Sequence, residues 1–392
     1  MSERAVVLFN PRDLVLRAAR RLGLDTVVVI QQEAPTPPGE YVDELLRCEW
    51  LTDLDAALAQ LAPLASSCVG AFGFGEIGSY AAAVANERFH WPGNTLASLL
   101  AFQRKAALRA AVGDRAGRPV RHRVCLSLDE LLAGAELIGY PCVVKPMDGT
   151  GSAGVRYLAG SDDCRAYADQ FPVSGGVLIE EYLLGREVSV EAMSVDGQHT
   201  LLAVTEKITT GRPDFVEMGH TLPISLDKPE HDRLWNVVEA TLTAAGHRYG
   251  VSHTEVMLTR TGPQLIESHG RPGGDRISDL IQLATGIDVF EQTMALTLGI
   301  DCDLEPRTQR LAGIRYLSFD TAVALAALDL APVERLPGIH EVVLSVPAGQ
   351  RPSVVHRSAD RHGFVVATGA DSVELAANLD RASAAVYQQL AH

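Results

Sequence analysis

The sequence is short of positive charge and of long apolar runs. Lys and Arg total 34 against 49 Asp and Glu, which gives a formal net charge of −15 at pH 7. An acidic surface repels nucleic acid and anionic membranes, so we expect neither as a partner, and an anionic ligand would need local positive charge in a cleft. No apolar run reaches membrane-spanning length and no long apolar segment follows the first residues, so neither a transmembrane helix nor a secretory signal is expected.

Cysteine is also scarce. The six cysteines are scattered along the chain, and no two of them form a C-x-x-C pair. Isolated cysteines of this kind are typical of small buried side chains in a reducing compartment, where disulfides do not persist. We therefore expect a cytoplasmic protein.

The features that are present indicate several domains. The 392 residues are too many for one ordinary hydrophobic core. Strand-like and helix-like segments alternate over residues 1–94, which predicts a small parallel α/β domain. One helix is expected over Thr95–Val112, with Lys105 and Arg109 on one face. An α+β module and antiparallel hairpins follow, and residues 306–392 have the pattern of a separate α+β tail. The predicted fold class is thus α/β and α+β.

A glycine-rich run raises the question of a nucleotide. Gly149, Gly151 and Gly154 have the G-x-G-x-x-G spacing of a dinucleotide-binding turn, but such a turn needs a helix after it. The following segment "VRYLAG" is strand-like, so the loop joins two strands and the NAD interpretation fails. No Lys-Ser or Lys-Thr closes the loop, which excludes a P-loop. A Gly/Ser hairpin can still close over phosphates through its backbone N–H groups, and a surface hairpin without a ligand is an equally good interpretation.

The segment "SHTEVMLTRTGPQLIESHG" predicts two strands around a turn near Thr261. With the turn centred there, Glu255 lies opposite Glu267 and His253 opposite His269, all on one face because side chains alternate. Facing carboxylates repel each other, and a divalent cation between them would remove the repulsion. Mg²⁺ prefers carboxylate and phosphate oxygens, so we interpret the pair as a metal site. A solvated sheet face is the alternative.

The segment "GRPGGDR" follows this hairpin directly and contributes Arg271 and Arg276. A guanidinium group can hold a carboxylate or a phosphate through two parallel hydrogen bonds. Arg271 lies four residues past Glu267, near enough to serve the same cleft. The alternative is a turn with solvated arginines.

The order of these motifs resembles the ATP-grasp superfamily of carboxylate–amine ligases over roughly residues 70–300. The motifs are the helical Lys105, the strand residue Lys145 before the glycine loop, the run Glu180-Glu181-Tyr182-Leu183 followed by "GREVSVE", and the facing glutamates. The tail segments "PGIHEVVLSVPAGQ" and "GFVVATGADSVELAANLDRA" resemble the C-terminal domain of the L-amino-acid ligase branch, which joins amino acids into dipeptides. The resemblance implies an N-terminal α/β domain (1–94), an ATP-grasp domain (95–305) with a lid at about 121–185, and a C-terminal α+β domain (306–392).

The resemblance also implies a role for individual residues. Those implied to bind ATP are Lys105 and Lys145 at the phosphates, Gly151 and Ser152 in the closing loop, Glu180, Tyr182 and Leu183 at the adenine, and Glu187 at the ribose. Those implied to bind Mg²⁺ are Glu255 and Glu267, with His269 where the family usually has asparagine. Those implied at the substrates are Arg271 and His220 in catalysis, with Glu76, Glu217, Arg271 and Gly274 in substrate binding. Imidazole is a softer ligand than Mg²⁺ favours, so His269 at the substrate is the alternative.

The implied reaction is ATP-dependent ligation of two amino acids through an acyl phosphate. Phosphoryl transfer leaves a protein mainly positioning and charge neutralisation to do, which suits a site of lysines, arginines and carboxylates without a nucleophilic side chain. The implied cofactors are ATP and two Mg²⁺ ions, with Mn²⁺ as an alternative metal, and the implied partners are small amino-acid substrates; a homodimer is left open. Two other functions stay open: an ATP-grasp ligase of the purine or carbamoyl-phosphate type, and a non-catalytic ATP-binding regulator.

Overall fold

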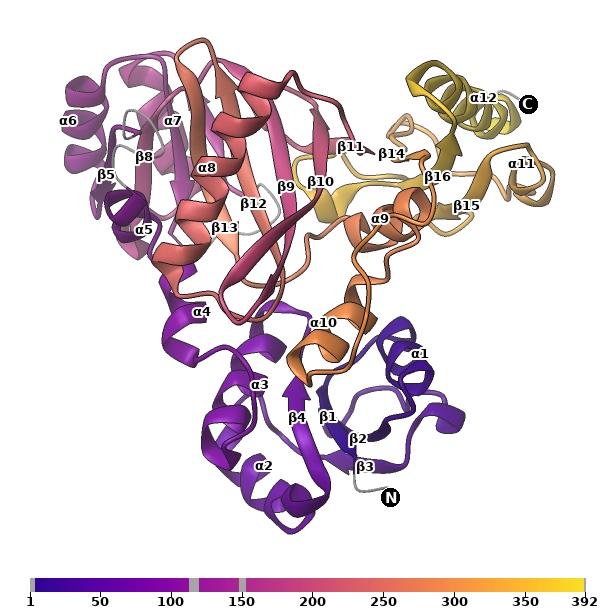
Figure 1. Cartoon of the computed structure of the whole chain (residues 1–392). Coiled ribbons are helices and arrows are strands. Elements are labelled where there is room, and N and C mark those ends of the chain that lie inside the picture. The colour runs from indigo at the N-terminus through magenta and orange to yellow at the C-terminus, as the bar shows by residue number, and fades with distance from the viewer. Residues whose placement is uncertain (1–3, 113–119, 148–152, 391–392) are drawn as a thin grey trace.

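The computed structural model describes residues 4–112, 120–147 and 153–390, which form three β-sheets (Figure 1). The N-terminal sheet has the order β3-β2-β1-β4 with parallel pairings, as the alternation of strands and helices predicts. Its inner strands are buried on both faces, which is why they consist of apolar runs. Its elements are β1 (Ala5–Phe9), α1 (Asp13–Arg21), β2 (Asp25–Ile30), β3 (Glu44–Arg47), α2 (Leu54–Leu61), β4 (Cys68–Phe72) and α3 (Glu76–Phe89).

The helix expected over Thr95–Val112 is two helices. α4 (Leu96–Gln103) begins at the Thr95 cap, and α5 (Lys105–Val112) begins after a break at Arg104, where φ is −86° and ψ is 62°. The two halves pack differently, because α4 contacts α3, β13 and α8, whereas α5 packs mainly against α8. A straight helix could not serve both surfaces, and no glycine or proline marks the break.

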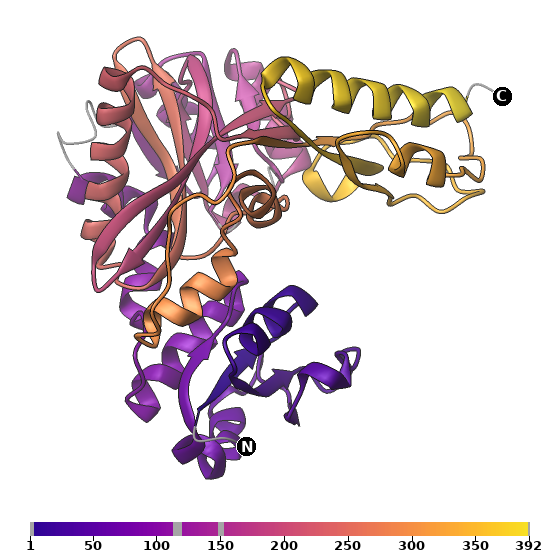
Figure 2. The same cartoon turned by 45° about the vertical axis from the view of Figure 1, so that its right-hand side comes forward.

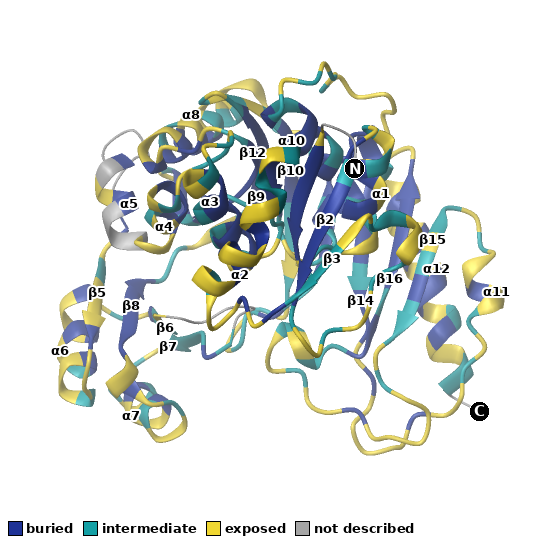
Figure 3. Cartoon of the chain, turned by 90° about the horizontal axis from the view of Figure 1, so that it is seen from below, coloured by how far each residue is buried: buried dark blue, intermediate teal, exposed yellow. Residues whose placement is uncertain are grey.

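A small antiparallel sheet, with the order β5-β8-β6-β7, occupies part of the predicted lid. Strands β6 and β7 are neighbours, so the glycine-rich segment joins two strands as predicted, although Gly149 and Gly151 lie outside the described residues. The two helices on this sheet, α6 and α7, each have an exposed face, as Figure 3 shows. Its elements are β5 (His122–Cys125), α6 (Leu128–Ile138), β6 (Cys142–Pro146), β7 (Arg156–Leu158), α7 (Ser161–Gln170) and β8 (Val177–Glu181).

The largest sheet is antiparallel and runs β13-β12-β9-β10-β11-β14-β16-β15. Its first hairpin turns at Asp196-Gly197, as the sequence predicts. The elements up to the tail are β9 (Gly185–Val195), β10 (Gln198–Thr209), β11 (Glu217–Leu222), α8 (Lys228–Ala245), β12 (Gly250–Thr259), β13 (Gly262–His269), α9 (Ile277–Thr285) and α10 (Val289–Thr297). No helix among the described residues combines the length and apolar character needed to cross a membrane.

The two faces of this sheet differ because successive side chains alternate. Val188 and Val190 on β9 point toward α8, where they pack with Leu234 and Val238. The opposite face packs against α9 and α10 at the end of β9 that carries Met193. Toward the other end of β9 this second face carries polar side chains, which build the site described below.

The tail extends the same sheet (Figure 2). Strand β14 pairs with β11, from Gly219 opposite Arg315 to Leu222 opposite Ala312, so the sheet is continuous across the expected 305/306 boundary. A single sheet can still span two domains, and the bounds of the three domains stay predictions. The elements of the tail are β14 (Leu311–Tyr316), α11 (Ala331–Glu334), β15 (Ile339–Leu344), β16 (Gly363–Gly369) and α12 (Ser372–Leu390).

Candidate active site

Four side chains of the β12–β13 hairpin share one face, as the sequence predicts. Glu255 lies opposite Glu267, and His253 lies opposite His269. Each imidazole also contacts the carboxylate of its own strand, with 3.2 Å from His253 Nε2 to Glu255 Oε1 and the same distance from His269 Nε2 to Glu267 Oε1. The hairpin therefore presents two acids and two imidazoles to one cleft.

The turn of this hairpin is not centred on Thr261. It consists of Arg260 and Thr261, and from that turn alone Glu255 would face Ile266. A β-bulge makes Ile266 an extra residue and brings Glu267 opposite Glu255 instead. The shifted turn and the bulge each change the pairing by one residue, in opposite directions. The predicted pair Glu255–Glu267 is therefore correct although the predicted turn is wrong.

Lys207, on β10, lies at the centre of the acidic face. Its Nζ lies 2.8 Å from both Glu187 Oε1 and Glu255 Oε1, and 3.5 Å from Glu217 Oε1. The side chain is 4% exposed. Burial would lower the pKa of Lys207, but the charges of the three carboxylates outweigh it and raise that pKa well above its usual value. Sequence reasoning missed this lysine, which is the cation that holds the acidic face together.

His253 occupies a second charged position behind Glu255. Its Nδ1 lies 2.8 Å from Glu191 Oε1, and Glu191 also accepts a hydrogen bond of 2.9 Å from Ser189 Oγ. Burial favours the neutral imidazole, but Glu191 and Glu255 outweigh it and raise the pKa of His253 to about 10. An imidazolium between two carboxylates fixes the orientation of Glu255.

Glu76, at the start of α3, closes the other side of the face. Its carboxylate accepts hydrogen bonds from Arg271 Nε, from Gln103 Nε2 and, at 2.6 Å, from Tyr80 Oη. His269 Nδ1 lies 3.6 Å from Glu76 Oε2. Burial would raise the pKa of Glu76, but Arg271 outweighs it and lowers the pKa. The structure thus brings the expected residues Glu76, Arg271 and His269 together.

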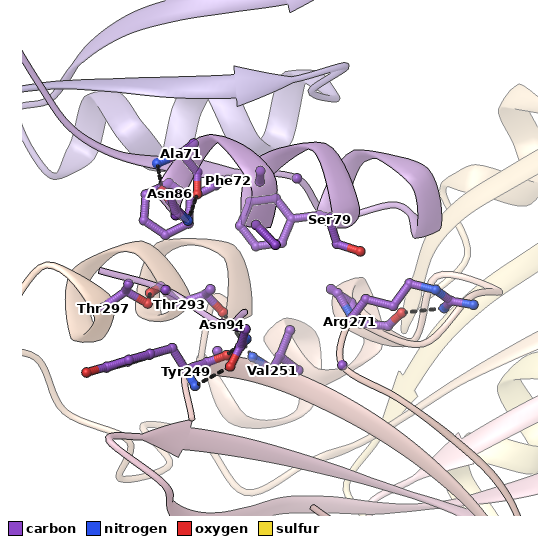
Figure 4. A pocket seen from close by; sticks show the side chains of 18 residues that line it. Ala71, Phe72, Ser79, Asn86, Asn94, Tyr249, Val251, Arg271, Thr293 and Thr297 are labelled. Atoms are coloured by element: carbon purple, nitrogen blue, oxygen red, sulfur yellow. Dashed lines mark hydrogen bonds between the residues drawn. The ribbon is translucent and has the colours of Figure 1, made fainter. Parts of the chain in front are cut away.

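A cavity of about 60 Å³ adjoins Arg271, as Figure 4 shows. It lies between the β4–α3 part of the N-terminal sheet and the region where β12 begins beside α10. Its walls consist largely of glycine, alanine and small polar side chains, among them Gly73, Ala82, Ala83, Gly270 and Thr293. The cavity has room for a few heavy atoms beside Arg271.

The lid strands add a second cationic centre. Lys145 Nζ lies 2.5 Å from Glu180 Oε2, and Arg109 Nη1 donates to Glu180 Oε1. Burial would raise the pKa of Glu180, but Lys145 and Arg109 outweigh it and lower the pKa to about 2. Arg109 Nη2 also donates to the carbonyl of the bulged Ile266 at 2.6 Å. Arg109 therefore connects strand β8 of the lid sheet to the β12–β13 hairpin, which carries the candidate metal ligands.

The segment after β8 carries an aromatic group. The ring of Tyr182 packs edge-on against Tyr157, with centroids 5.1 Å apart, and the Arg212 guanidinium lies 4.2 Å from the centroid of Tyr157 and 4.9 Å from that of Tyr182. Arg212 belongs to the β10–β11 turn, so this turn contacts the lid. Leu183, the residue after Tyr182, is half-buried.

His220, on β11, is joined to the tail. Its Nε2 lies 2.9 Å from Asp275 Oδ2, and Arg361 donates to both Asp275 oxygens at 2.7 and 2.6 Å. Glu217, on the same strand, accepts a hydrogen bond of 2.8 Å from Ser358 Oγ. The tail therefore contributes directly to this end of the site.

The remaining expected residues have different outcomes. Gly151 and Ser152 lie outside the described residues, and so does the side chain of Lys105. Gly274 borders open space, since a Cβ atom built there would meet nothing within 4 Å. Arg276, a candidate to hold a carboxylate or a phosphate, pairs with the carboxylates of Asp279 at 2.7 Å and Glu341 at 2.5 Å.

The donor set on the hairpin suits Mg²⁺ only in part. Among the described residues, no cluster of three or more His, Cys, Asp or Glu side chains is arranged to hold a metal ion by itself. The carboxylates Glu255 and Glu267 are oxygen ligands of the kind that Mg²⁺ prefers, and Mg²⁺ commonly completes its shell with substrate phosphates and water. The residues present therefore fit an ion that arrives with a nucleotide.

Two known domain families match this chain. The ATP-grasp domain matches residues 138–279, and the family described as L-amino acid ligase C-terminal domain 2 matches residues 315–391. The uncharacterized protein y4rH of Sinorhizobium fredii is 30% identical over 375 residues, which are 91% of this chain and 76% of that protein.

Two characterised proteins are more distant. The alanine–anticapsin ligase of Bacillus subtilis is 22% identical over 311 residues, which are 71% of this chain and 62% of that ligase. The crystal structure of an L-amino acid ligase from Bacillus licheniformis matches with a TM-score of 0.82 at 20% identity, and the match covers 98% of both chains. At this identity the structural likeness shows a shared fold.

Proposed function

Because this chain belongs to the ATP-grasp superfamily of carboxylate–amine ligases, and within it to the L-amino-acid ligase branch, we propose that it joins the carboxylate of one amino acid to the amine of a second and converts ATP to ADP and phosphate. The name of the Bacillus subtilis relative, alanine–anticapsin ligase, supports an amino acid as a substrate. The chain is an ATP-dependent ligase, and its substrates are small molecules.

The chemistry explains why the site needs cations and acids rather than a nucleophile. An amine does not displace oxide from a carboxylate, so the carboxylate oxygen first attacks the γ-phosphorus of ATP and ADP leaves. The amine then attacks the carbonyl carbon of the acyl phosphate, and phosphate leaves. The protein has to position the reactants and neutralise charge in both steps.

The observation that carries the proposal is the meeting of facing carboxylates and a buried cation on one sheet face. Glu255 and Glu267 face each other, and Lys207 lies against Glu255. We propose that these two carboxylates hold Mg²⁺, with His269 beside them, and that two ions take part, with Mn²⁺ as a substitute. Bound Mg²⁺ would neutralise phosphate oxygens and polarise the transferred group.

The ATP site that we propose lies between the lid sheet and the polar face. Lys145 and Lys105 would bind phosphates, with Gly151 and Ser152 closing over them. Glu180, Tyr182 and Leu183 would meet the adenine, and Glu187 the ribose. The contacts of Glu180 with Lys145 and Arg109, and of Glu187 with Lys207, support a nucleotide site here, since each of these two carboxylates lies beside a cation.

The amino-acid site that we propose lies around the Arg271–Glu76 pair. Arg271 would hold the carboxylate and the developing oxyanion, and Glu76 would hold an ammonium group. The small cavity supports this placement, because Arg271 is one of its lining residues. His220, Glu217 and Gly274 would line the side that faces the tail.

The other functions are less well supported. The L-amino acid ligase domain at residues 315–391 favours amino-acid ligation over a purine or carbamoyl-phosphate type reaction. An intact set of acids and cations favours an enzyme over a regulator. We also propose a cytoplasmic location, which the six free cysteines support, and a homodimer.

The test is ATP-dependent phosphate release with a mixture of amino acids, combined with mass detection of the product. The proposal expects release that depends on amino acids and yields a dipeptide. Glu267→Gln should abolish turnover and keep the fold, whereas the control Glu206→Gln, on the exposed part of β10, should stay active. Release with bicarbonate or a purine precursor but not with amino acids would overturn the proposal.

A further inference from the structure

The His220–Asp275–Arg361 cluster is more constrained than a structural contact requires. Asp275 has a left-handed backbone, with φ at 51°. This conformation strains a non-glycine residue and persists only where the surroundings impose it. Arg361 lies 3.4 Å from the ring centroid of Tyr316 and donates from Nε to the carbonyl of Ser358 at 2.7 Å. Both partners are thus fixed independently of His220.

The carboxylate of Asp275 determines which imidazole nitrogen carries a hydrogen. Burial would raise the pKa of Asp275, but Arg361 and His220 outweigh it and hold that pKa well below its usual range. The ionised group can only accept, so His220 Nε2 must donate to it, and in the neutral ring Nδ1 then carries a lone pair. Nδ1 is buried with no hydrogen-bond partner among the described residues. A buried acceptor without a partner is unfavourable until a donor reaches it.

Both signs of charge surround the ring. The groups that face the ring or its carboxylate are Lys207 from β10, Ile314 and Tyr316 from β14, Asp275 from the segment before α9, and Arg361 from the tail. Arg361 pairs with Asp275, and Lys207 pairs with Glu187, Glu217 and Glu255. His220 also lies opposite Lys207, on the face that carries the acidic pair.

We propose that Asp275 and Arg361 are positioning residues for ligation, which hold His220 with a free Nδ1 that accepts a proton from the ammonium group of the amine substrate. This inference rests on the proposed function. The ammonium N–H bond breaks and an Nδ1–H bond forms; the neutral amine then attacks the acyl phosphate, the C–N bond forms and the C–O bond to phosphate breaks. The departing phosphate takes the second proton from nitrogen, and His220 returns its proton to water after product release.

Hydroxylamine separates this step from the formation of the acyl phosphate. It is a much weaker base than an amino-acid amine and is largely unprotonated at neutral pH, so it traps an acyl phosphate as a hydroxamate without a base. The experiment compares dipeptide formation from an amino-acid mixture with hydroxamate formation from the same mixture plus hydroxylamine. Asp275→Asn removes the carboxylate that orients the base and should slow dipeptide formation about 100-fold, the lower end of what a general base contributes, while hydroxamate formation stays at the wild-type rate. Raising the pH should restore part of the dipeptide rate, because the solution then deprotonates the amine.

Two further variants sharpen the result. Arg361→Lys replaces a bidentate fork with a point charge and should shift the ratio of the two products in the same direction by a smaller factor; it also decides the matter if Asp275→Asn does not fold. Asp279→Asn removes the same charge on α9, where its partner is Arg276, and should leave the ratio unchanged. Equal loss of both products in Asp275→Asn or Arg361→Lys, or no loss of either, overturns the proposal. A wild-type chain that forms neither product refutes the proposed function itself.

Discussion

Replacing Lys207 with methionine tests whether the acidic face depends on one buried cation. The lysine Nζ contacts two carboxylates at 2.8 Å and a third at 3.5 Å, and 4% of its side chain is exposed. Methionine has a similar length and an apolar end, so Lys207→Met removes the charge and leaves no large cavity. Glu187 and Glu255, both half-buried, would then lose the ammonium contact, and Glu255 would keep its contact with His253.

The magnitude follows from the burial. At an effective dielectric constant of about 20, Coulomb's law gives about 6 kcal/mol of attraction for a charge pair 2.8 Å apart. Desolvation of the ammonium group offsets much of this, and removal of one partner from a buried ion pair costs about 3–5 kcal/mol. The matched control is Lys228→Met. Lys228 also lies 2.8 Å from a carboxylate, that of Asp232, but its side chain is 86% exposed, so solvent screens the pair and its loss should matter little.

Urea unfolding followed by tryptophan fluorescence measures the difference. Lys207→Met should lower the unfolding midpoint clearly and Lys228→Met should not, with midpoints compared directly because a chain of this size need not unfold in two states. Adding Glu255→Gln to Lys207→Met should recover part of the loss, since one uncompensated charge is then removed. Equal midpoints for the two lysine variants, or no recovery in the double variant, would refute the reasoning.

Two further outcomes are expected. The pKa of Glu180 is lowered to about 2, so its ion pairs stabilise the fold above the ordinary glutamate pKa of 4.5, and this stabilisation is lost as the pH falls through about 2. The difference in stability between the wild type and Glu180→Gln should therefore be full above pH 4.5 and shrink as the pH falls toward 2, and a difference that does not change with pH would contradict the ion triad. A Cβ atom at Gly273 would lie 2.7 Å from His253 Nδ1, so Gly273→Ala should displace the imidazole and reduce turnover. Gly160→Ala, where a Cβ meets nothing within 4 Å, is its control; wild-type turnover in Gly273→Ala would show that His253 need not stay in place.

The acidic hairpin shows what the sequence could and could not predict. The alternation of side chains predicts that Glu255 and Glu267 share a face, and the structure agrees. The bulge at Ile266 was not predictable, because a bulge leaves no mark in the apolar pattern. The same holds in the first hairpin: the Asp196-Gly197 turn alone would pair Val188 with Thr205, whereas a register shift pairs it with Glu206. When carboxylates on one strand contact a cation on another, a register shift of one residue determines whether the contact forms.

The residues that sequence reasoning missed come from distant parts of the chain. Lys207 reaches Glu255 across the central strand, and Arg361 reaches Asp275 from the tail. Neither contact has a local signature, because a lysine on a strand or an arginine in a loop is usually solvated. The break at Arg104 has no sequence mark either, since it follows from what the two helices pack against. Local patterns therefore predicted the elements, and tertiary packing supplied the charge partners.

The pairing of β11 with β14 limits how such a chain can be cut or recombined. β11 carries Glu217 and His220, and its outer edge is satisfied by the tail. A protein truncated at residue 305 would bare the N–H and C=O groups of this strand, and an unpaired strand of this kind invites intermolecular association. Chimaeras that exchange the C-terminal part between ligases should accordingly keep β11, β14 and β16 from one parent, because the junction is a shared ladder rather than a linker.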